Sequence, residues 1–241
     1  MTLVFVHGAG CTPASFGSFP LRFAGSVTLA LPGRCGDASS PSSVATFADF
    51  VSGAVAGLGG DGFGGDTSGG VVLCGHSMGG AIALQVALRG VDGVRGLALL
   101  GSGSRLRVAP PIFERLAADF PAAARELAGW FFADPTPERL DSAVADMLRV
   151  GQAQTVRDFR ACDAFDAGSR LNELRVPLLA VTGERDAMTP PKYAQSLADR
   201  VPLGSARIIP DAGHFAMIER PDEVADAIAA FAATARAGPQ R

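Results

Sequence analysis

The chain has 241 residues, of which 48% are hydrophobic, and a formal net charge of −3. These values suit one large α/β domain, and they leave no basic field for nucleic acid and no polybasic run for a membrane surface. No apolar run is long enough to cross a bilayer, and the N-terminal residues MTLVFVHG do not resemble a signal peptide. We therefore expect a cytoplasmic protein that has no nucleic-acid partner and no stable membrane insertion.

Six short segments have a nearly continuous apolar sequence. Such segments are typical of strands that are covered on both faces, which indicates a parallel sheet. In chain order they are TLVFV (2–6), SVTLALPG (26–33), GVVLCG (70–75), VRGLALLGSG (94–103), VPLLAVTG (176–183) and ARIIPDAG (206–213).

Helical patterns lie between these strands, at 12–24, 42–58, 78–90, 189–200 and 219–235. Thr12 is expected to cap the first helix, with Pro13 at its first position. The second helix is expected to bury one stripe of apolar residues, namely Val44, Phe47, Phe50, Val51 and Val55. The alternation of strands and helices predicts an α/β three-layer sandwich, with a mostly parallel sheet of about six strands and helices on both faces.

Residues 104–175 interrupt this alternation. They contain no clear strand, but they hold several short amphipathic helix patterns separated by Pro and Gly, with an apolar and aromatic side. We expect a helical cap inserted after the fourth strand, over an α/β core formed by 1–103 and 176–241. The alternative is a set of packing helices without a role in ligand binding.

Two further features carry no predicted chemistry. The Gly-rich stretch 57–70 contains a GxGxxG pattern, but it follows a helix and precedes a strand, which is the reverse of a dinucleotide-binding motif. We interpret it as a surface connection. The cysteines have neither CxxC nor zinc-ligand spacing, so we expect reduced thiols, no metal site and no cofactor; they are Cys11, Cys35, Cys74 and Cys162.

The segment CGHSMGGA (74–81) places Ser77 between a strand pattern and a helix pattern, within a GxSxG sequence. This context is typical of a nucleophile elbow. Gly75 and Gly79 remove the side chains that would collide across so tight a turn. We expect Ser77 to have a positive φ and to present its hydroxyl above the edge of the sheet. The alternative is a serine that caps an ordinary turn.

A serine hydroxyl needs a base to become a good nucleophile, and the chain has three histidines. His76 adjoins the serine and is expected to point away around the turn. His7 ends the first strand and is expected to anchor the loop that follows. His214 follows the last strand, and the carboxyl ends of parallel strands share one edge of a sheet. His214 is therefore the predicted base.

Asp186, just after the fifth strand, is the predicted acid that orients His214. Glu184 is expected to point elsewhere, and Asp211 is expected to shape the turn in PDAGH. The resulting chain order of serine, aspartate and histidine is that of an α/β-hydrolase.

Acyl transfer also needs two fixed N–H donors for the tetrahedral anion. The Met78 amide, at the start of the helix after Ser77, is one predicted donor. The Gly-rich loop HGAGC (7–11) is expected to supply the other, with Ala9 preferred over Gly10.

The segments VFVHGAG, LPGRCGDASS, GHSMGGAIALQVA, VTGERDAMTP and AGHFAMIERPDEV resemble successive blocks of the α/β-hydrolase superfamily, from about residue 2 to residue 231. The chain is similar to small serine esterases, lipases and acyl hydrolases that carry a helical cap. The resemblance implies the same triad and the same oxyanion donors. Most relatives begin with an antiparallel strand pair before the HG strand, so we expect a sheet shorter by about two strands.

The predicted mechanism is two-step cleavage of a carboxylic ester, and the apolar cap favours a small or medium acyl or aromatic substrate. We expect a monomer or homodimer that acts on a small-molecule ester. Thioester, lactone, amide or carbon–carbon bond hydrolysis and perhydrolysis use the same machinery, and a non-catalytic ligand-binding relative is the alternative from another class. Trp130, Phe131 and Phe215 are expected to line the substrate pocket. Four arginines are candidates for binding an anionic group, although we interpret them as ordinary surface residues: Arg105, Arg107, Arg157 and Arg160.

Overall fold

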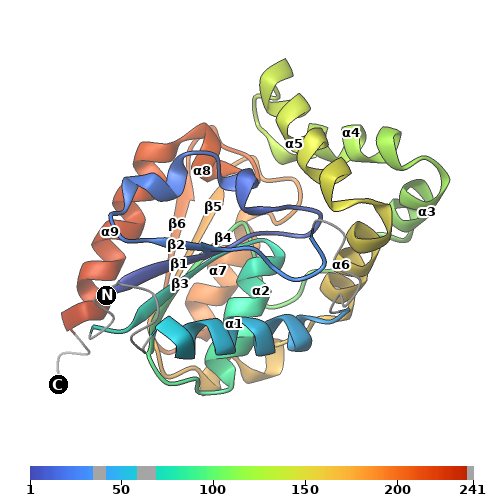
Figure 1. Cartoon of the computed structure of the whole chain (residues 1–241). Coiled ribbons are helices and arrows are strands. Elements are labelled where there is room, and N and C mark those ends of the chain that lie inside the picture. The colour runs from blue at the N-terminus through green and yellow to red at the C-terminus, as the bar shows by residue number, and fades with distance from the viewer. Residues whose placement is uncertain (35–41, 59–68, 238–241) are drawn as a thin grey trace.

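The core of the fold is a six-stranded sheet in which every pair of neighbouring strands is parallel. The computed structural model describes residues 1–34, 42–58 and 69–237 (Figure 1). The strand order is β2-β1-β3-β4-β5-β6. The strands are β1 (Thr2–Val6), β2 (Val27–Leu29), β3 (Val71–His76), β4 (Val94–Leu100), β5 (Leu178–Gly183) and β6 (Gly204–Ile209).

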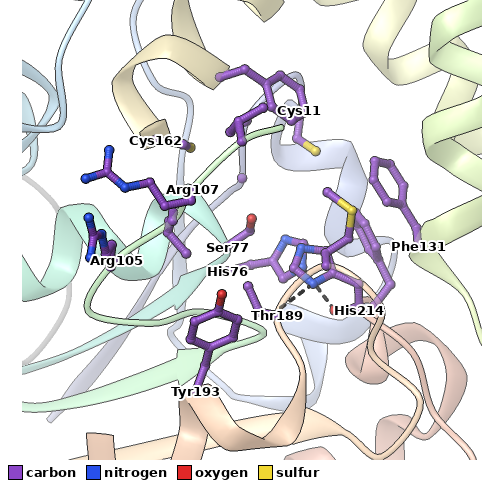
Figure 2. Close-up of a pocket in the computed structure, with 17 residues that line it drawn as sticks. Cys11, His76, Ser77, Arg105, Arg107, Phe131, Cys162, Thr189, Tyr193 and His214 are labelled. Carbon is purple, nitrogen blue, oxygen red and sulfur yellow. Dashed lines mark hydrogen bonds between the residues drawn. The ribbon is translucent and has the colours of Figure 1, made fainter. Parts of the chain in front are cut away.

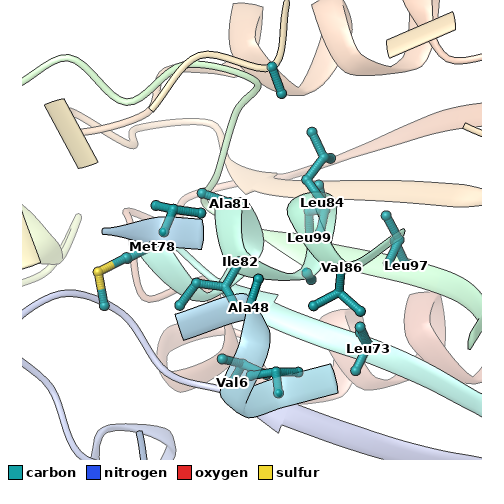
Figure 3. Close-up of a cluster of buried hydrophobic side chains, with 14 of the residues drawn as sticks. Val6, Ala48, Leu73, Met78, Ala81, Ile82, Leu84, Val86, Leu97 and Leu99 are labelled. Carbon is teal, nitrogen blue, oxygen red and sulfur yellow. The ribbon is translucent and has the colours of Figure 1, made fainter. Parts of the chain in front are cut away.

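Alternate residues of the central strands enter two separate hydrophobic cores, which explains the continuous apolar runs. Val6 and Leu73 face the core beneath α1 (Val44–Leu58), α2 (Met78–Leu88) and α7 (Pro191–Arg200). Figure 3 shows part of this cluster around α2. Phe5 and Val72 face the opposite core, beneath α9 (Pro221–Ala237) and the short helix α8 (Ala216–Glu219) that precedes it. The predicted sandwich with helices on both faces is therefore confirmed.

The predicted helix at 12–24 is wrong, because this segment forms two 3₁₀-helices, η1 (Pro13–Phe16) and η2 (Phe19–Arg22). The Thr12 hydroxyl caps η1 as expected, accepting a hydrogen bond from the Ala14 amide at 3.2 Å. Gly17 then adopts a φ of 53°, and Pro20 follows within η2. A continuous α-helix is excluded because a proline in its interior removes a donor and clashes with the preceding turn.

The apolar stripe of α1 is narrower than predicted. Val44, Phe47, Val51 and Val55 are buried, whereas Phe50 is 39% exposed. At about 100° per residue, position 50 falls beside this stripe and not on it.

Four helices follow β4 at the predicted position of the cap. They are α3 (Pro110–Ala118), α4 (Phe120–Phe131), α5 (Pro137–Val150) and α6 (Gln152–Ala164), and the 3₁₀-helix η3 (Gly168–Glu173) leads on to β5. In Figure 1 α3, α4 and α5 stand away from the sheet, whereas α6 lies beside the α/β core and contacts α2. The division of the chain at 103/104 and 175/176 stays a prediction.

Some sequence-based expectations concern residues that the structure does not describe. Cys35 and most of the Gly-rich stretch 57–70 lie outside the described residues. Cys11, Cys74 and Cys162 are buried free thiols. Within the described ranges, no helix combines the length and the apolar character that a membrane crossing requires.

Candidate active site

Ser77 occupies a sharp turn between β3 and α2. Its φ of 53° and ψ of −116° confirm the expected positive φ, which is rare for a residue other than glycine. The turn is so tight that a Cβ on Gly75 would lie 2.3 Å from the backbone oxygen of Gly79, and one on Gly79 would lie 2.0 Å from that of Val6. These contacts explain the glycines on either side of the serine, and the strained turn brings Ser77 to the rim of the pocket.

The loops after β5 and β6 bring Asp186 and His214 together. The Nδ1–H of His214 donates to Oδ2 of Asp186 at 2.9 Å, and both side chains are buried. Asp186 also accepts hydrogen bonds from the Met188 and Thr189 amides at 2.8 Å, and from the Thr189 hydroxyl at 2.8 Å. Burial alone would raise the pKa of Asp186, but His214 and these donors outweigh it and lower that pKa. The carboxylate therefore stays ionised and keeps the Nε2 of His214 free to accept a proton.

The two competing carboxylates lie elsewhere. Glu184 and Asp211 are both exposed, and the Asp211 amide donates to Glu184 at 3.5 Å. Asp211 has a φ of 49°, a conformation that aspartate tolerates better than most residues. Neither makes a hydrogen bond with His214 in the part of the chain that the structure describes.

His7 anchors the loop after β1. It is fully buried, its Nε2 accepts from the Leu31 amide at 3.2 Å, and its Nδ1–H donates to the Gly8 carbonyl at 3.1 Å. Burial, followed by the charge of Arg34, lowers the pKa of His7 to about 3. The ring is therefore neutral and fully used by the backbone, which leaves it no part in proton transfer.

The expectation that His76 points away from the site is wrong. Its ring centroid lies 4.8 Å from that of His214 and 4.4 Å from that of Phe215, and Figure 2 shows it beside His214. The Nε2–H of His76 donates to the backbone carbonyl of His214 at 3.2 Å. Burial, then the neighbouring His214, lowers the pKa of His76 well below its ordinary value. A neutral His76 thus supports the backbone that carries His214.

Ala9 lies in the loop after β1, and Met78 directly follows Ser77 at the start of α2. Ala9 lines the same pocket as Ser77, and Met78 begins α2 with its side chain in the core (Figure 3). Among the described residues, neither backbone amide donates to a protein acceptor. The amide of Gly10, the second choice, is already bonded to a carboxylate of Asp158 at 2.9 Å. The Ala9 and Met78 amides are therefore available to a ligand.

Ser77 and His214 open onto one cavity (Figure 2). Its walls are mainly apolar and come from the cap, the loop after β4 and the loops after β5 and β6, with Leu106, Val108, Phe131, Phe159, Met188 and Phe215 as the large contributors. The Ser77 hydroxyl makes no hydrogen bond with another described residue, and a rotation about χ1 changes its direction within the cavity.

The structure brings Phe131 and Phe215 to this cavity but not Trp130. Trp130 is 38% exposed and lines a separate small hollow between α3 and α4. Consecutive residues of a helix point about 100° apart, so only one of the two cap aromatics faces Ser77.

Two of the four arginines reach the wall of the cavity. Arg105 and Arg107 line it, but each is about half exposed and lies near a carboxylate, Asp166 at 3.3 Å and Asp163 at 3.8 Å respectively. The interpretation as ordinary surface residues therefore stays a prediction for Arg105 and Arg107, whereas Arg157 and Arg160 do not line the cavity.

Two groups near the site escaped sequence analysis. Thr189 bonds to both Asp186 and His214, and its position three residues after an aspartate was a usable signal of a side-chain-capped turn. Asp146 and Asp158 bind the loop after β1 from the cap. The one feature of the sequence that could have indicated this role is that each is a carboxylate on the buried side of a cap helix.

Comparison with known proteins agrees with this architecture. Residues 3–227 match the family described as the alpha/beta hydrolase family, and the chain therefore belongs to that family. In its fold it is similar to the structure of a thermophilic esterase, with a TM-score of 0.84 and 28% identity over 97% of this chain and 90% of that one. Fold and family together define an esterase-like hydrolase.

Several curated relatives match part of the chain. The chain is 31% identical over 185 residues to polyketide synthase ThaQ of Burkholderia thailandensis, which covers 71% of this chain and 9% of that protein. It is 30% identical over 160 residues to the pimeloyl-(acyl-carrier protein) methyl ester esterase of Neisseria meningitidis, which covers 59% of this chain and 61% of that enzyme. The match thus spans less than two thirds of either relative.

Proposed function

We propose that the chain is a serine hydrolase that cleaves a carboxylic ester of a small or medium acyl or aromatic substrate through an acyl-enzyme. The observation that carries this proposal is the buried pair of Asp186 and His214, 2.9 Å apart, at one cavity with a serine on a strained turn. Such a pair supplies the base that a serine nucleophile needs.

In this mechanism the Ser77 oxygen attacks the ester carbonyl carbon while the Nε2 of His214 takes its proton. The Ala9 and Met78 amides stabilise the negative oxygen of the tetrahedral intermediate. His214 then gives the proton to the leaving alkoxide, and the acyl group stays on Ser77. A water molecule then attacks the acyl carbon while the Nε2 of His214 takes its proton. His214 gives this proton to the Ser77 oxygen as the acid leaves. Asp186 stabilises the imidazolium throughout.

The walls of the cavity are mainly apolar, with Arg105 and Arg107 also among the lining residues, which supports a substrate with an apolar acyl or aryl part. The aromatic rings among these walls, Phe131 and Phe215, suit an acyl chain or an aryl group. The Neisseria relative is named as a methyl ester esterase and the structural relative as an esterase, which also supports a carboxylic ester. A cytoplasmic location, the absence of a nucleic-acid partner and a monomeric or homodimeric state stay predictions.

The first test is a series of p-nitrophenyl esters of rising acyl length, combined with labelling by a fluorophosphonate. We expect wild type to be labelled at Ser77 and to cleave the shorter esters, and Ser77→Ala to lose labelling and at least ~10³-fold in kcat. Ser52→Ala, at a partly buried serine on α1, is the matched control and should behave as wild type.

Other outcomes separate the alternatives. Full activity in Ser77→Ala would exclude the serine mechanism. Labelling without turnover of any ester, thioester or lactone in a wider panel would favour a non-catalytic ligand-binding protein. Faster cleavage of a thioester, a lactone or a carbon–carbon bond than of any ester would change the substrate class but keep the triad.

A further inference from the structure

The loop after β1 is held by two carboxylates from the cap. The Gly10 amide donates to Oδ2 of Asp158 on α6 at 2.9 Å. The Thr12 amide donates to Oδ2 of Asp146 on α5 at 2.8 Å, and the Thr12 hydroxyl donates to Oδ1 of the same carboxylate at 2.5 Å. Two amides on either side of Cys11 are thus bound to the cap, while the Ala9 amide is left free.

Asp158 has the most enclosed of these positions. Its side chain is completely buried and accepts from Arg34 Nη2 at 2.8 Å and from Gln154 Nε2 at 2.7 Å. The Nε–H of Arg34 also donates to the Cys11 carbonyl at 2.8 Å. The ion pair therefore makes two hydrogen bonds to the loop. Asp158 accepts from the Gly10 amide, and Arg34 donates to the Cys11 carbonyl.

Buried ion pairs contribute little net stability on average, because desolvation offsets most of their attraction. The contribution of this pair is to fix the conformation of the loop after β1. Gly10 has a φ of 62°, and a Cβ at this position would lie 3.2 Å from Thr155 and 3.4 Å from Met147, so the loop fits closely beneath the cap. The Ala9 and Gly10 amides belong to consecutive peptide units, so releasing the Gly10 amide frees the dihedrals of Ala9.

We propose that Asp158 is a positioning residue that fixes the Ala9 amide as an oxyanion donor, so that the cap is a structural part of the oxyanion hole. The proposal rests on the proposed function, because it assumes that Ala9 meets the oxyanion. It also implies that α6 stays in contact with the loop after β1 during turnover, because their separation would displace the Ala9 amide from the oxyanion hole.

The test compares Asp158→Ala and Asp158→Asn with Leu127→Ala, which removes a buried cap side chain that does not line the catalytic cavity. For each variant the thermal midpoint, kcat and KM for a p-nitrophenyl ester, and the inhibition constant of a trifluoromethyl ketone are measured. This inhibitor binds as a tetrahedral adduct whose oxyanion needs the hole, whereas the ester in its ground state does not.

We expect Asp158→Ala to lose ~10–100-fold in kcat, with KM changed less than ~3-fold and with inhibitor affinity reduced by the same factor as kcat. Asp158→Asn keeps an oxygen that accepts from Gly10, so it should lose less than the alanine variant. Leu127→Ala should keep kcat within ~2-fold even though its thermal midpoint falls. If Asp158→Ala does not fold, a fall in both kcat and inhibitor affinity for Asp158→Asn still tests the proposal.

Three outcomes would overturn it. The first is a wild-type kcat in a folded Asp158→Ala or, where that variant does not fold, in Asp158→Asn. The second is a loss of kcat that Leu127→Ala matches at an equal loss of thermal stability. The third is a fall in kcat without any fall in inhibitor affinity. If wild type itself has no hydrolase activity and no fluorophosphonate label, the proposed function fails first and this inference fails with it.

Discussion

Asp186 is surrounded by hydrogen-bond donors to a degree that its own position in the sequence did not reveal. Besides His214, it binds two backbone amides and the hydroxyl of Thr189, and it is buried. Each of these donors favours the ionised carboxylate, so the group keeps its charge at neutral pH despite burial. That charge holds the imidazole of His214 in the tautomer that leaves Nε2 unprotonated.

Asp186→Asn should therefore lower kcat by ~10³–10⁴-fold with little change in KM, because an amide stabilises neither this tautomer nor the imidazolium. Glu184→Gln is the matched control, since Glu184 is exposed and lies two residues away in the same loop. Initial rates on one p-nitrophenyl ester across pH 6–9 measure both variants. Equal kcat values for Asp186→Asn and Glu184→Gln would contradict the assignment of the acid.

The candidate triad residues followed from the sequence because parallel strands deliver their carboxyl ends to one edge, whatever their separation along the chain. The orientation of single side chains did not follow. His76 lies on the face of β3 that Val72 and Cys74 share, where His214 and Phe215 pack against it, and Phe131 replaced Trp130 because the phase of a cap helix depends on its packing. Both depend on contacts between distant parts of the chain.

At the scale of elements, the turn from β3 to α2 is packed so closely that it leaves no room for a side chain at Gly75 or Gly79. The backbone of Gly79 lies against the end of β1, so close that no side chain fits between them. α2 is also buried along most of its length, beneath α1 and the sheet. The position of Ser77 therefore depends on β1, β3 and α2, and a shift of any of these elements would move its hydroxyl.

Two Gly→Ala substitutions should have opposite effects on stability. Gly79→Ala should destabilise the fold by ~3 kcal/mol or more, because its Cβ would meet the backbone oxygen of Val6 at 2.0 Å. Gly53→Ala, at an exposed position of α1 with nothing within 4 Å, should stabilise it by ~0.5–1 kcal/mol. Urea denaturation of both variants gives the free energies of unfolding. A Gly79→Ala protein as stable as wild type would contradict the close approach described here.

The four central strands were predictable because a strand covered on both faces leaves a nearly unbroken apolar run. The edge strands β2 and β6 are less buried, but their apolar runs also form strands. The segment 12–24 was not predictable, because its apolar spacing is helical while Gly17 and Pro20 decide the backbone locally. The link from the cap to the loop after β1 was beyond sequence analysis. It joins Gly10 to Asp158 across 148 positions, and no local pattern reports such a pairing.

At the scale of the whole molecule, two buried histidines tie stability to pH. The pKa of His7 is lowered to about 3, and that of His76 lies well below its ordinary value, in both cases chiefly because of burial. Unfolding returns each ring to a pKa near ~6.5. The unfolded chain therefore binds more protons than the folded chain below this pH, so stability is fully present above ~6.5 and falls as the pH is lowered.

His7 should cost about 2 kcal/mol of stability between pH 7 and pH 5, and His76 should add to the loss in the same direction. Urea denaturation at the two pH values measures the loss. His7→Gln, which keeps an acceptor for the Leu31 amide but does not titrate, should lose about 2 kcal/mol less than wild type over the same interval. The same loss in both proteins would show that His7 does not contribute to the pH dependence.

The buried pair of Arg34 and Asp158 has a consequence for protein engineering. The arginine belongs to the first part of the α/β core and the aspartate to the last cap helix, and each is buried against the other. A chimera that takes its cap from another hydrolase would leave the buried Arg34 guanidinium unpaired, unless the new cap has a carboxylate at the position of Asp158. Recombination designs for this scaffold should therefore inherit both residues from the same parent.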